Sequence, residues 1–372
     1  MRLDNNQQAY FTLLKAGLWE LEVRLSQLGE VDYEFVFRLA QEQSVTGLLA
    51  AGLEKLSDVK VPQSLTLQIV GDCLQLEKKN GEMNGFVCSL FEKLKAAGIE
   101  ALLVKGQGIA QSYERPLWRA CGDVDLLLDE ENYQKAKTVL APLAESEEPE
   151  VLYRMHKAYS IKNMEVELHG NMCGRFLKRV DNVLDKMQEE MFEGYEFRIW
   201  KCGEVDVPLP SVNNDAIFVF THILQHFFIE GIGLRQICDW CRLLWRYRSE
   251  INCDLLEQRL QKMGMLTEWK AFGSLAVEYL GMPAEAMPFY SDSQKWKNKA
   301  NRVLAFVLET GNFGHNRDRS YYKKYPFLVC KTISVARHTW DGLRYFRIFP
   351  LDAMKIWFEM IGTGIHVAIK GV

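Results

Sequence analysis

The stretch Asp123-Val124-Asp125-Leu126-Leu127-Leu128 decides the fold of this chain and points to its chemistry. It is an apolar run that carries two carboxylates spaced two residues apart. Because side chains alternate along a strand, Asp123 and Asp125 share one face, and Val124 and Leu126 share the other. Like charges placed side by side repel each other, so the pair indicates a cation between them. Carboxylate oxygens suit Mg²⁺, and Mn²⁺ can take its place.

A third acid lies downstream of this pair. Period two places Glu165, Glu167 and His169 on one face of the strand that follows the polar turn at 162–163. A strand that carries Glu167 beside the first strand would complete a set of three carboxylates around one metal. On an exposed strand edge the first two acids alone could instead serve solubility. The third acid therefore favours the metal site.

Two cations precede the acid pair. The apolar run 101–104 ends at Lys105-Gly106-Gln107-Gly108, which is typical of a short buried strand that enters a glycine turn. Arg119 lies four residues before Asp123. A helix that starts near Gln107 would point backbone amides at an anion.

Together these elements resemble the polymerase-β-like nucleotidyltransferase superfamily, and within it the bacterial group of uncharacterised nucleotidyltransferases. Members of that group typically carry Leu-Lys-Gly, an alanine and a tyrosine, Arg-x-x-x-Asp-(Ile/Val)-Asp-Leu-Leu, and later an acid-Leu-His strand. The matching residues here are Val104-Lys105-Gly106, Ala110, Tyr113, Arg119, Asp123-Val124-Asp125-Leu126-Leu127 and Glu167-Leu168-His169. The match covers about residues 98–170. The turn departs from the superfamily, which usually has Gly-Ser or Gly-Gly there.

The resemblance implies transfer of a nucleoside monophosphate from an NTP to an acceptor, with release of pyrophosphate. Asp123, Asp125 and Glu167 would be the catalytic carboxylates and the ligands of Mg²⁺ or Mn²⁺. Glu167 would also help to deprotonate the acceptor. Neither the nucleotide nor the acceptor is specified by the sequence.

The same resemblance implies the nucleotide-binding residues. Lys105 would neutralise triphosphate charge as a flexible point charge, and Arg119 would do so with its planar fork. Gly106 and Gly108 would let the backbone approach the phosphates closely.

Three alternatives to this enzyme stay open. A degenerate relative could bind nucleotide without turnover, although the three intact acids argue against it. An adenylyltransferase of the toxin–antitoxin type, acting on a protein or RNA, would use the same core. A helical scaffolding protein would not explain Lys105 or the acids.

Helical periodicity on both sides of the core predicts an α+β fold. We expect a small mixed-sheet nucleotidyltransferase core at residues 98–210, between helical regions at 1–97 and 211–372. Within the core, a hairpin is expected over 195–210, and a helix near 131–143 after the acid-bearing strand. The long flanks favour a dedicated region for binding the acceptor.

Composition excludes several classes of protein. The chain has 372 residues, 48% of them hydrophobic, and a formal charge of −4, which gives no global drive toward nucleic acid or anionic membrane. The nine cysteines have no framework spacing and no signal peptide precedes them, which predicts reduced thiols and a cytoplasmic location. No apolar run reaches the ~18 residues of a transmembrane helix.

Two spacings in the C-terminal half invite a metal interpretation. His222 and His226 lie four residues apart, but Ile223 replaces the glutamate that a zincin requires, so core or substrate-facing histidines are favoured. Cys238 and Cys241 have the spacing of a metal or redox pair without a second pair, which favours inert thiols.

A basic, aromatic segment occupies residues 313–350, with eight Lys or Arg against two acids. Its basic residues are Arg317, Arg319, Lys323, Lys324, Lys331, Arg337, Arg344 and Arg347. The segment is either a solvated helix face over an aromatic core, a binding surface for an anionic acceptor, or a peripheral contact with a membrane surface.

Overall fold

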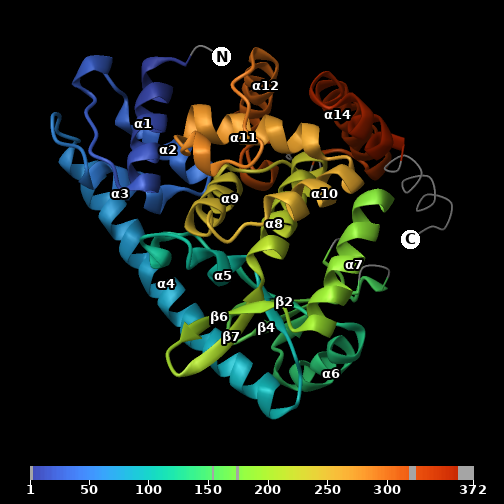
Figure 1. Cartoon of the computed structure of the whole chain (residues 1–372). Coiled ribbons are helices and arrows are strands. Elements are labelled where there is room, and N and C mark those ends of the chain that lie inside the picture. Colours follow the sequence, from blue (N-terminus) through green and yellow to red (C-terminus); the bar gives the residue numbers. More distant parts are fainter. Residues whose placement is uncertain (1–2, 153–154, 173–175, 318–323, 359–372) are drawn as a thin grey trace.

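The computed structural model describes residues 3–152, 155–172, 176–317 and 324–358. It confirms the α+β class, with two small sheets beneath a larger body of helices (Figure 1). The N-terminal part is helical as predicted. Its helices are α1 (Asn5–Trp19), α2 (Tyr33–Glu42), α3 (Thr46–Glu54) and α4 (Gln63–Ala96). Pro62 precedes α4, the long helix that runs from the helical body down to the sheets.

Five strands form the main sheet, in the order β1-β2-β5-β4-β3. Their bounds are β1 (Leu102–Val104), β2 (Asp123–Leu127), β3 (Ser146–Glu147), β4 (His156–Ile161) and β5 (Met164–His169). β2 pairs with β5 in parallel, and the other neighbours are antiparallel, so the sheet is mixed as expected. The β4–β5 hairpin turns at Lys162 and Asn163, both with positive φ.

The rest of the core surrounds this sheet. The predicted hairpin is confirmed as β6 (Phe197–Cys202) and β7 (Val205–Pro210). Three helices belong to the same part of the chain: α5 (Gly106–Ala110), α6 (Glu130–Leu140) and α7 (Lys178–Gly194). Asp129 caps α6 by accepting a hydrogen bond from the backbone of Asn132.

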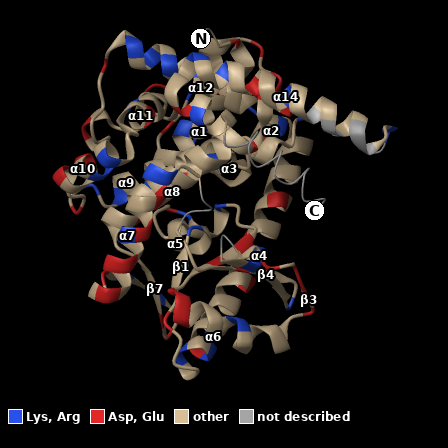
Figure 2. Ribbon diagram, turned by 90° about the vertical axis from the view of Figure 1, so that its right-hand side faces the viewer, with Lys and Arg blue, Asp and Glu red and all other residues tan. Residues whose placement is uncertain are grey.

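The C-terminal part is again helical. Its helices are α8 (Val212–Ile229), α9 (Leu234–Arg246), α10 (Cys253–Met263), α11 (Leu266–Leu280), α12 (Gln294–Thr310) and α14 (Phe327–Ile348). The beginning of α14 projects away from the other helices (Figure 2). No helix in the described part of the chain is both long and apolar enough to cross a membrane.

The two helical regions share one hydrophobic core although they are far apart in sequence. Buried side chains of α1–α3 and of α8–α12 belong to the same cluster. The Trp19 indole donates a hydrogen bond of 2.6 Å to the Leu280 carbonyl, which joins α1 to α11. A second cluster fills the space between the main sheet, α4 and α6. The N- and C-terminal helical regions therefore form a single packed body, and the sheets lie against it.

One expectation about the cysteines is wrong. Cys88 on α4 and Cys202 on β6 form a disulfide, with their Cα atoms 6.1 Å apart. A separation of 114 residues hides such a pairing from the sequence. Cys73, Cys121, Cys238 and Cys241 are thiols in buried positions, which agrees with inert cysteines at the last two. Cys173 lies outside the described residues.

The basic segment is only partly described. Arg317 pairs with Asp341 at 2.9 Å, and Arg344 pairs with Glu309 at 2.7 Å. These contacts agree with the interpretation of a charged helix face over an aromatic core. Arg319 and Lys323 lie outside the described residues, and the two binding interpretations of the segment stay predictions.

Candidate metal and nucleotide site

The three predicted carboxylates meet at one face of the main sheet. In the parallel β2–β5 pair, Asp125 stands opposite Glu167, and Asp123 stands opposite Glu165. One oxygen from each of Asp123, Asp125 and Glu167 lies within 4.8 Å of the others. Glu165 is exposed at the start of its strand and is not in this cluster. Alternation alone puts both glutamates on one face, and the β2–β5 register sets Glu167 beside Asp125, in agreement with the acid that the resemblance implies.

The carboxylates repel one another strongly. The neighbouring Asp125, and then burial, raise the pKa of Asp123 to about 6. The Asp125 carboxylate is only 2% exposed. Burial alone would raise its pKa, but Lys105 and His169 offset this and hold it below the ordinary value. The arrangement stays anionic and is suited to a cation.

Lys105 lies directly against this acid. Its Nζ donates a hydrogen bond of 2.7 Å to Asp125 Oδ1. Burial alone would lower the pKa of Lys105, but the Asp125 carboxylate raises it above its ordinary value. In this structure Lys105, the predicted triphosphate contact, is therefore the counterion of Asp125, the predicted metal ligand.

The two glycines of the turn have different surroundings. Gly106 has φ +36°, and a Cβ there would lie 3.2 Å from Cys121 Sγ and 3.3 Å from the Asp123 carbonyl. A Cβ on Gly108 would lie 3.0 Å from Leu209 Cδ2 on β7. Gly106 thus lets the turn approach the acid-bearing strand, whereas Gly108 permits close packing against β7. A phosphate contact at either one stays a prediction.

Arg119 is placed differently from the other predicted site residues. Its Nε and Nη2 donate hydrogen bonds of 3.0 and 2.7 Å to the two oxygens of Asp239 on α9. The Tyr113 hydroxyl donates to the same carboxylate at 2.8 Å. This buried fork joins the loop before β2 to the helical body. Arg119 still lines the cavity at the acids, and its Nη1 has no hydrogen-bond partner among the described residues.

That cavity has a volume of about 200 Å³ and a second wall that the sequence did not predict. The same cavity is lined by His222 and His226 of α8, Arg235 of α9 and Phe313. The histidines line this cavity, which is compatible with the substrate-facing alternative. Burial holds the pKa of His222 well below its ordinary value, so that imidazole is neutral.

Arg235 is the cation that sequence reasoning missed. It lies in the first turn of α9, four residues before Asp239, so both side chains share one face of the helix. Its Nη1 donates a hydrogen bond of 3.2 Å to the Ala120 carbonyl just before β2. The four-residue spacing of Arg235 and Asp239 was the only indication in the sequence that Arg235 belongs to the site. The contact between α9 and the residues before β2 is long-range and leaves no local pattern.

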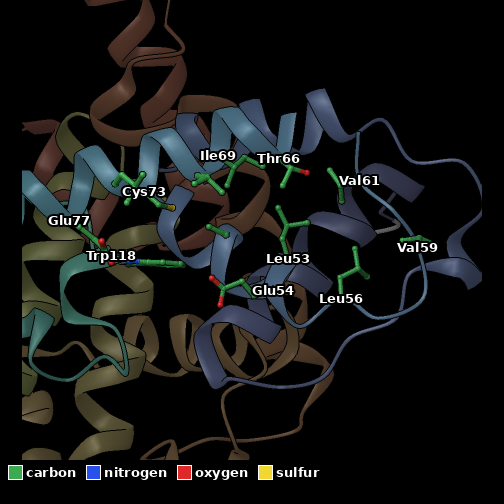
Figure 3. A pocket seen from close by; sticks show the side chains of 13 residues that line it. Leu53, Glu54, Leu56, Val59, Val61, Thr66, Ile69, Cys73, Glu77 and Trp118 are labelled. Carbon is green, nitrogen blue, oxygen red and sulfur yellow. Dashed lines mark hydrogen bonds between the residues drawn. The ribbon is translucent and has the colours of Figure 1, made fainter. Parts of the chain in front are cut away.

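A larger hollow lies elsewhere, between α3 and α4 (Figure 3), with a volume of about 350 Å³. Leu53, Leu56, Val61 and Ile69 make its lining mostly hydrocarbon. Both of its acids already have partners: Glu54 pairs with Arg115 at 2.7 Å, and Glu77 accepts from the Trp118 indole at 2.5 Å. It has room for a ligand but no group placed for catalysis.

The fold and the site define an α+β protein with a clustered acidic cation site and flanking cations. The family model of the uncharacterised nucleotidyltransferases matches residues 29–281, which is well over half of the chain. The chain belongs to this family of nucleotidyltransferases. No curated protein and no solved structure matches it.

Proposed function

We propose that this chain is a nucleotidyltransferase that depends on Mg²⁺, or on Mn²⁺ in its place. It would transfer a nucleoside monophosphate from an NTP to an acceptor and release pyrophosphate. The observation that carries the proposal is that the three candidate ligand carboxylates and the cationic side chains of Lys105, Arg119 and Arg235 line one cavity. Membership of the nucleotidyltransferase family supports the reaction class. The paired acids beside a parallel third acid support the wider polymerase-β-like superfamily.

The donor set fits a hard divalent cation. Asp123, Asp125 and Glu167 offer oxygen atoms only, at the mutual spacing of ligands to one ion. Their repulsion, visible in the raised pKa of Asp123, would be relieved by that ion. When bound, the cation would neutralise phosphate charge and make the attacking nucleophile more acidic.

The protein's own residues divide the remaining work. The acceptor oxygen, or another nucleophile, forms a bond to the α-phosphorus, and the bond from that phosphorus to the oxygen bridging to the β-phosphate breaks. Lys105 and Arg235 counter the charge of the departing pyrophosphate. Glu167 is ionised, because hydrogen bonds from His156 and His169 outweigh the effect of burial on its pKa and lower it. We assign it to cation binding first, and then to uptake of the acceptor's proton.

The test is pyrophosphate release from each of the four NTPs with a panel of small-molecule acceptors, in Mg²⁺ or Mn²⁺ and with a chelator as control. We expect metal-dependent binding of at least one NTP and release that requires an acceptor. Binding without release on any acceptor would favour the degenerate relative. No NTP binding with either metal would overturn the proposal. Bacterial origin stays a prediction from the resemblance. Cytoplasmic location also stays a prediction, and the Cys88–Cys202 disulfide contradicts the reduced thiols on which it was partly based.

A further inference from the structure

Two histidines contact the catalytic glutamate from outside the cavity. His156 of β4 stands opposite His169 of β5 in the antiparallel register, and their ring centres are 5.0 Å apart. His156 Nε2 lies 3.2 Å from Glu167 Oε2, and His169 Nε2 lies 3.3 Å from the same oxygen. All three side chains keep partial access to solvent, at 26% for His156, 19% for His169 and 22% for Glu167. Neither histidine lines the cavity at the acids.

The spacing of these atoms fits a shared metal ion. Bonds of about 2.0–2.1 Å to a tetrahedral ion put neighbouring ligand atoms about 3.3–3.4 Å apart. Both N···O separations are close to that edge, and the shorter one is also a hydrogen bond at the upper end of the usual range. The three ligand atoms all lie within 4.8 Å of one another. Binding at His169 Nε2 would replace its present contact with Asp125 Oδ1 at 2.8 Å.

We propose that His156, Glu167 and His169 form a second cation site, distinct from the carboxylate site and selective for a borderline divalent metal such as Zn²⁺. Two imidazole nitrogens and one carboxylate are donors that zinc accepts and that Mg²⁺ disfavours. With three protein ligands and partial exposure, the site leaves its fourth position to water or a ligand.

The two sites share Glu167 but not the same oxygen. Both histidines contact Oε2, so Oε1 can serve the cation held with Asp123 and Asp125. Occupation of the histidine site would withdraw negative charge from the carboxylate site and weaken Mg²⁺ there. The inference uses the residue that the proposed function also uses, but it does not require nucleotidyl transfer to occur.

The experiment is titration of the chelator-treated, full-length protein with Co²⁺, which absorbs visible light far more strongly in tetrahedral sites than in octahedral ones. We expect one equivalent to bind with tetrahedral absorption and to be displaced by Zn²⁺. His156→Ala should weaken this binding at least about tenfold, because it removes one of three ligands. Asp123→Asn removes an acid of the first site only and should keep the absorption. His226→Ala, a histidine of the cavity wall, is the matched control and should also keep it.

Wild-type protein without tetrahedral absorption would overturn the second site. So would wild-type Co²⁺ affinity in His156→Ala. Should His156→Ala fail to fold by circular dichroism, His156→Gln retains a polar side chain without the imidazole, and the same loss is expected. Intact Co²⁺ binding in a protein that never releases pyrophosphate would sink the proposed function and leave this site standing.

Discussion

Neighbouring carboxyl groups occur in two regions of this molecule, and the repulsion between them is relieved differently in each region. At the sheet, Asp123, Asp125 and Glu167 line a cavity beside Lys105. In the helical core, Glu268 of α11 lies beside Asp352, and both are almost completely buried. Asp352 accepts a hydrogen bond from Arg179, whereas burial and then Asp352 raise the pKa of Glu268 to about 8. The enclosed pair thus keeps a proton.

A chemical site and a structural pair of acids differ in how their negative charge is neutralised. An enclosed pair of acids reaches neutrality with a proton and an arginine, because no ion can enter. The acids at the sheet remain mostly ionised and line a cavity, which Lys105 and Arg235 also line. Ionised side chains of both signs that line a cavity are the feature that marks a chemical site.

The largest effect is expected at the aspartates. Asp123→Asn should lower metal-dependent turnover by about 10³-fold and leave stability equal or higher, because it removes a repelled charge. Asp125→Asn should lower turnover as much but cost about 3 kcal/mol of unfolding free energy, since Lys105 loses its buried counterion. Turnover assays and urea denaturation measure the two effects. Wild-type turnover in either variant would contradict the assignment.

The two glutamates of β5 provide the next test. Glu167→Gln should reduce turnover by at least about 10²-fold, because it removes an ionised group from the cation site. Glu165→Gln, a matched change two residues away on the exposed start of the strand, should cost little. Steady-state kinetics at saturating Mg²⁺ compares them. A larger loss in Glu165→Gln than in Glu167→Gln would place Glu165 rather than Glu167 at the cation.

Arg235 should act on the nucleotide. Arg235→Ala should weaken NTP binding about tenfold, the value of one lost charge-assisted contact. Arg347→Ala, on an exposed turn of α14, is the control and should leave the affinity unchanged. Calorimetric titration of an NTP with Mg²⁺ measures both. If Arg347→Ala weakens binding and Arg235→Ala does not, the nucleotide lies over the basic segment instead.

The smallest effect concerns the enclosed pair. The pKa of Glu268 is raised from 4.5 to about 8, so the folded state holds a proton that the unfolded state releases between those values. The wild-type free energy of unfolding should therefore fall as pH rises from 4.5 to about 8, by up to about 1.4 kcal/mol per pH unit. Glu268→Gln should abolish this slope. Urea denaturation at pH 5.5 and 8.5 tests it, with the exposed Glu92→Gln as control.

Local patterns were enough to predict much of the site. Alternation along β2 and β5 correctly brought Asp123, Asp125 and Glu167 to one face, because that period is a property of the strand itself. The turn at Lys105 followed equally from its neighbours. The face of each strand could thus be predicted from alternation, and the family resemblance implied that Glu167 joins the two aspartates.

Long-range pairing could not be predicted in the same way. The Arg119–Asp239 fork joins residues 120 positions apart, and Arg235 reaches the cavity only because α9 packs against the loop before β2. Which cation meets a phosphate and which is held by a carboxylate depends on that packing. No periodicity in the sequence predicts this packing.

The contact between Lys105 and Asp125 has a consequence for the order of ligand binding. The protein carries its own positive charge at the place where a divalent ion would be needed, so an ion arriving alone must compete with the ammonium group. A triphosphate offers Lys105 a new anionic partner and frees Asp125 at the same moment. Metal and nucleotide affinities are therefore thermodynamically linked, each strengthening the other by the same factor. The ion and the nucleotide should enter as one complex, with little affinity for either component alone.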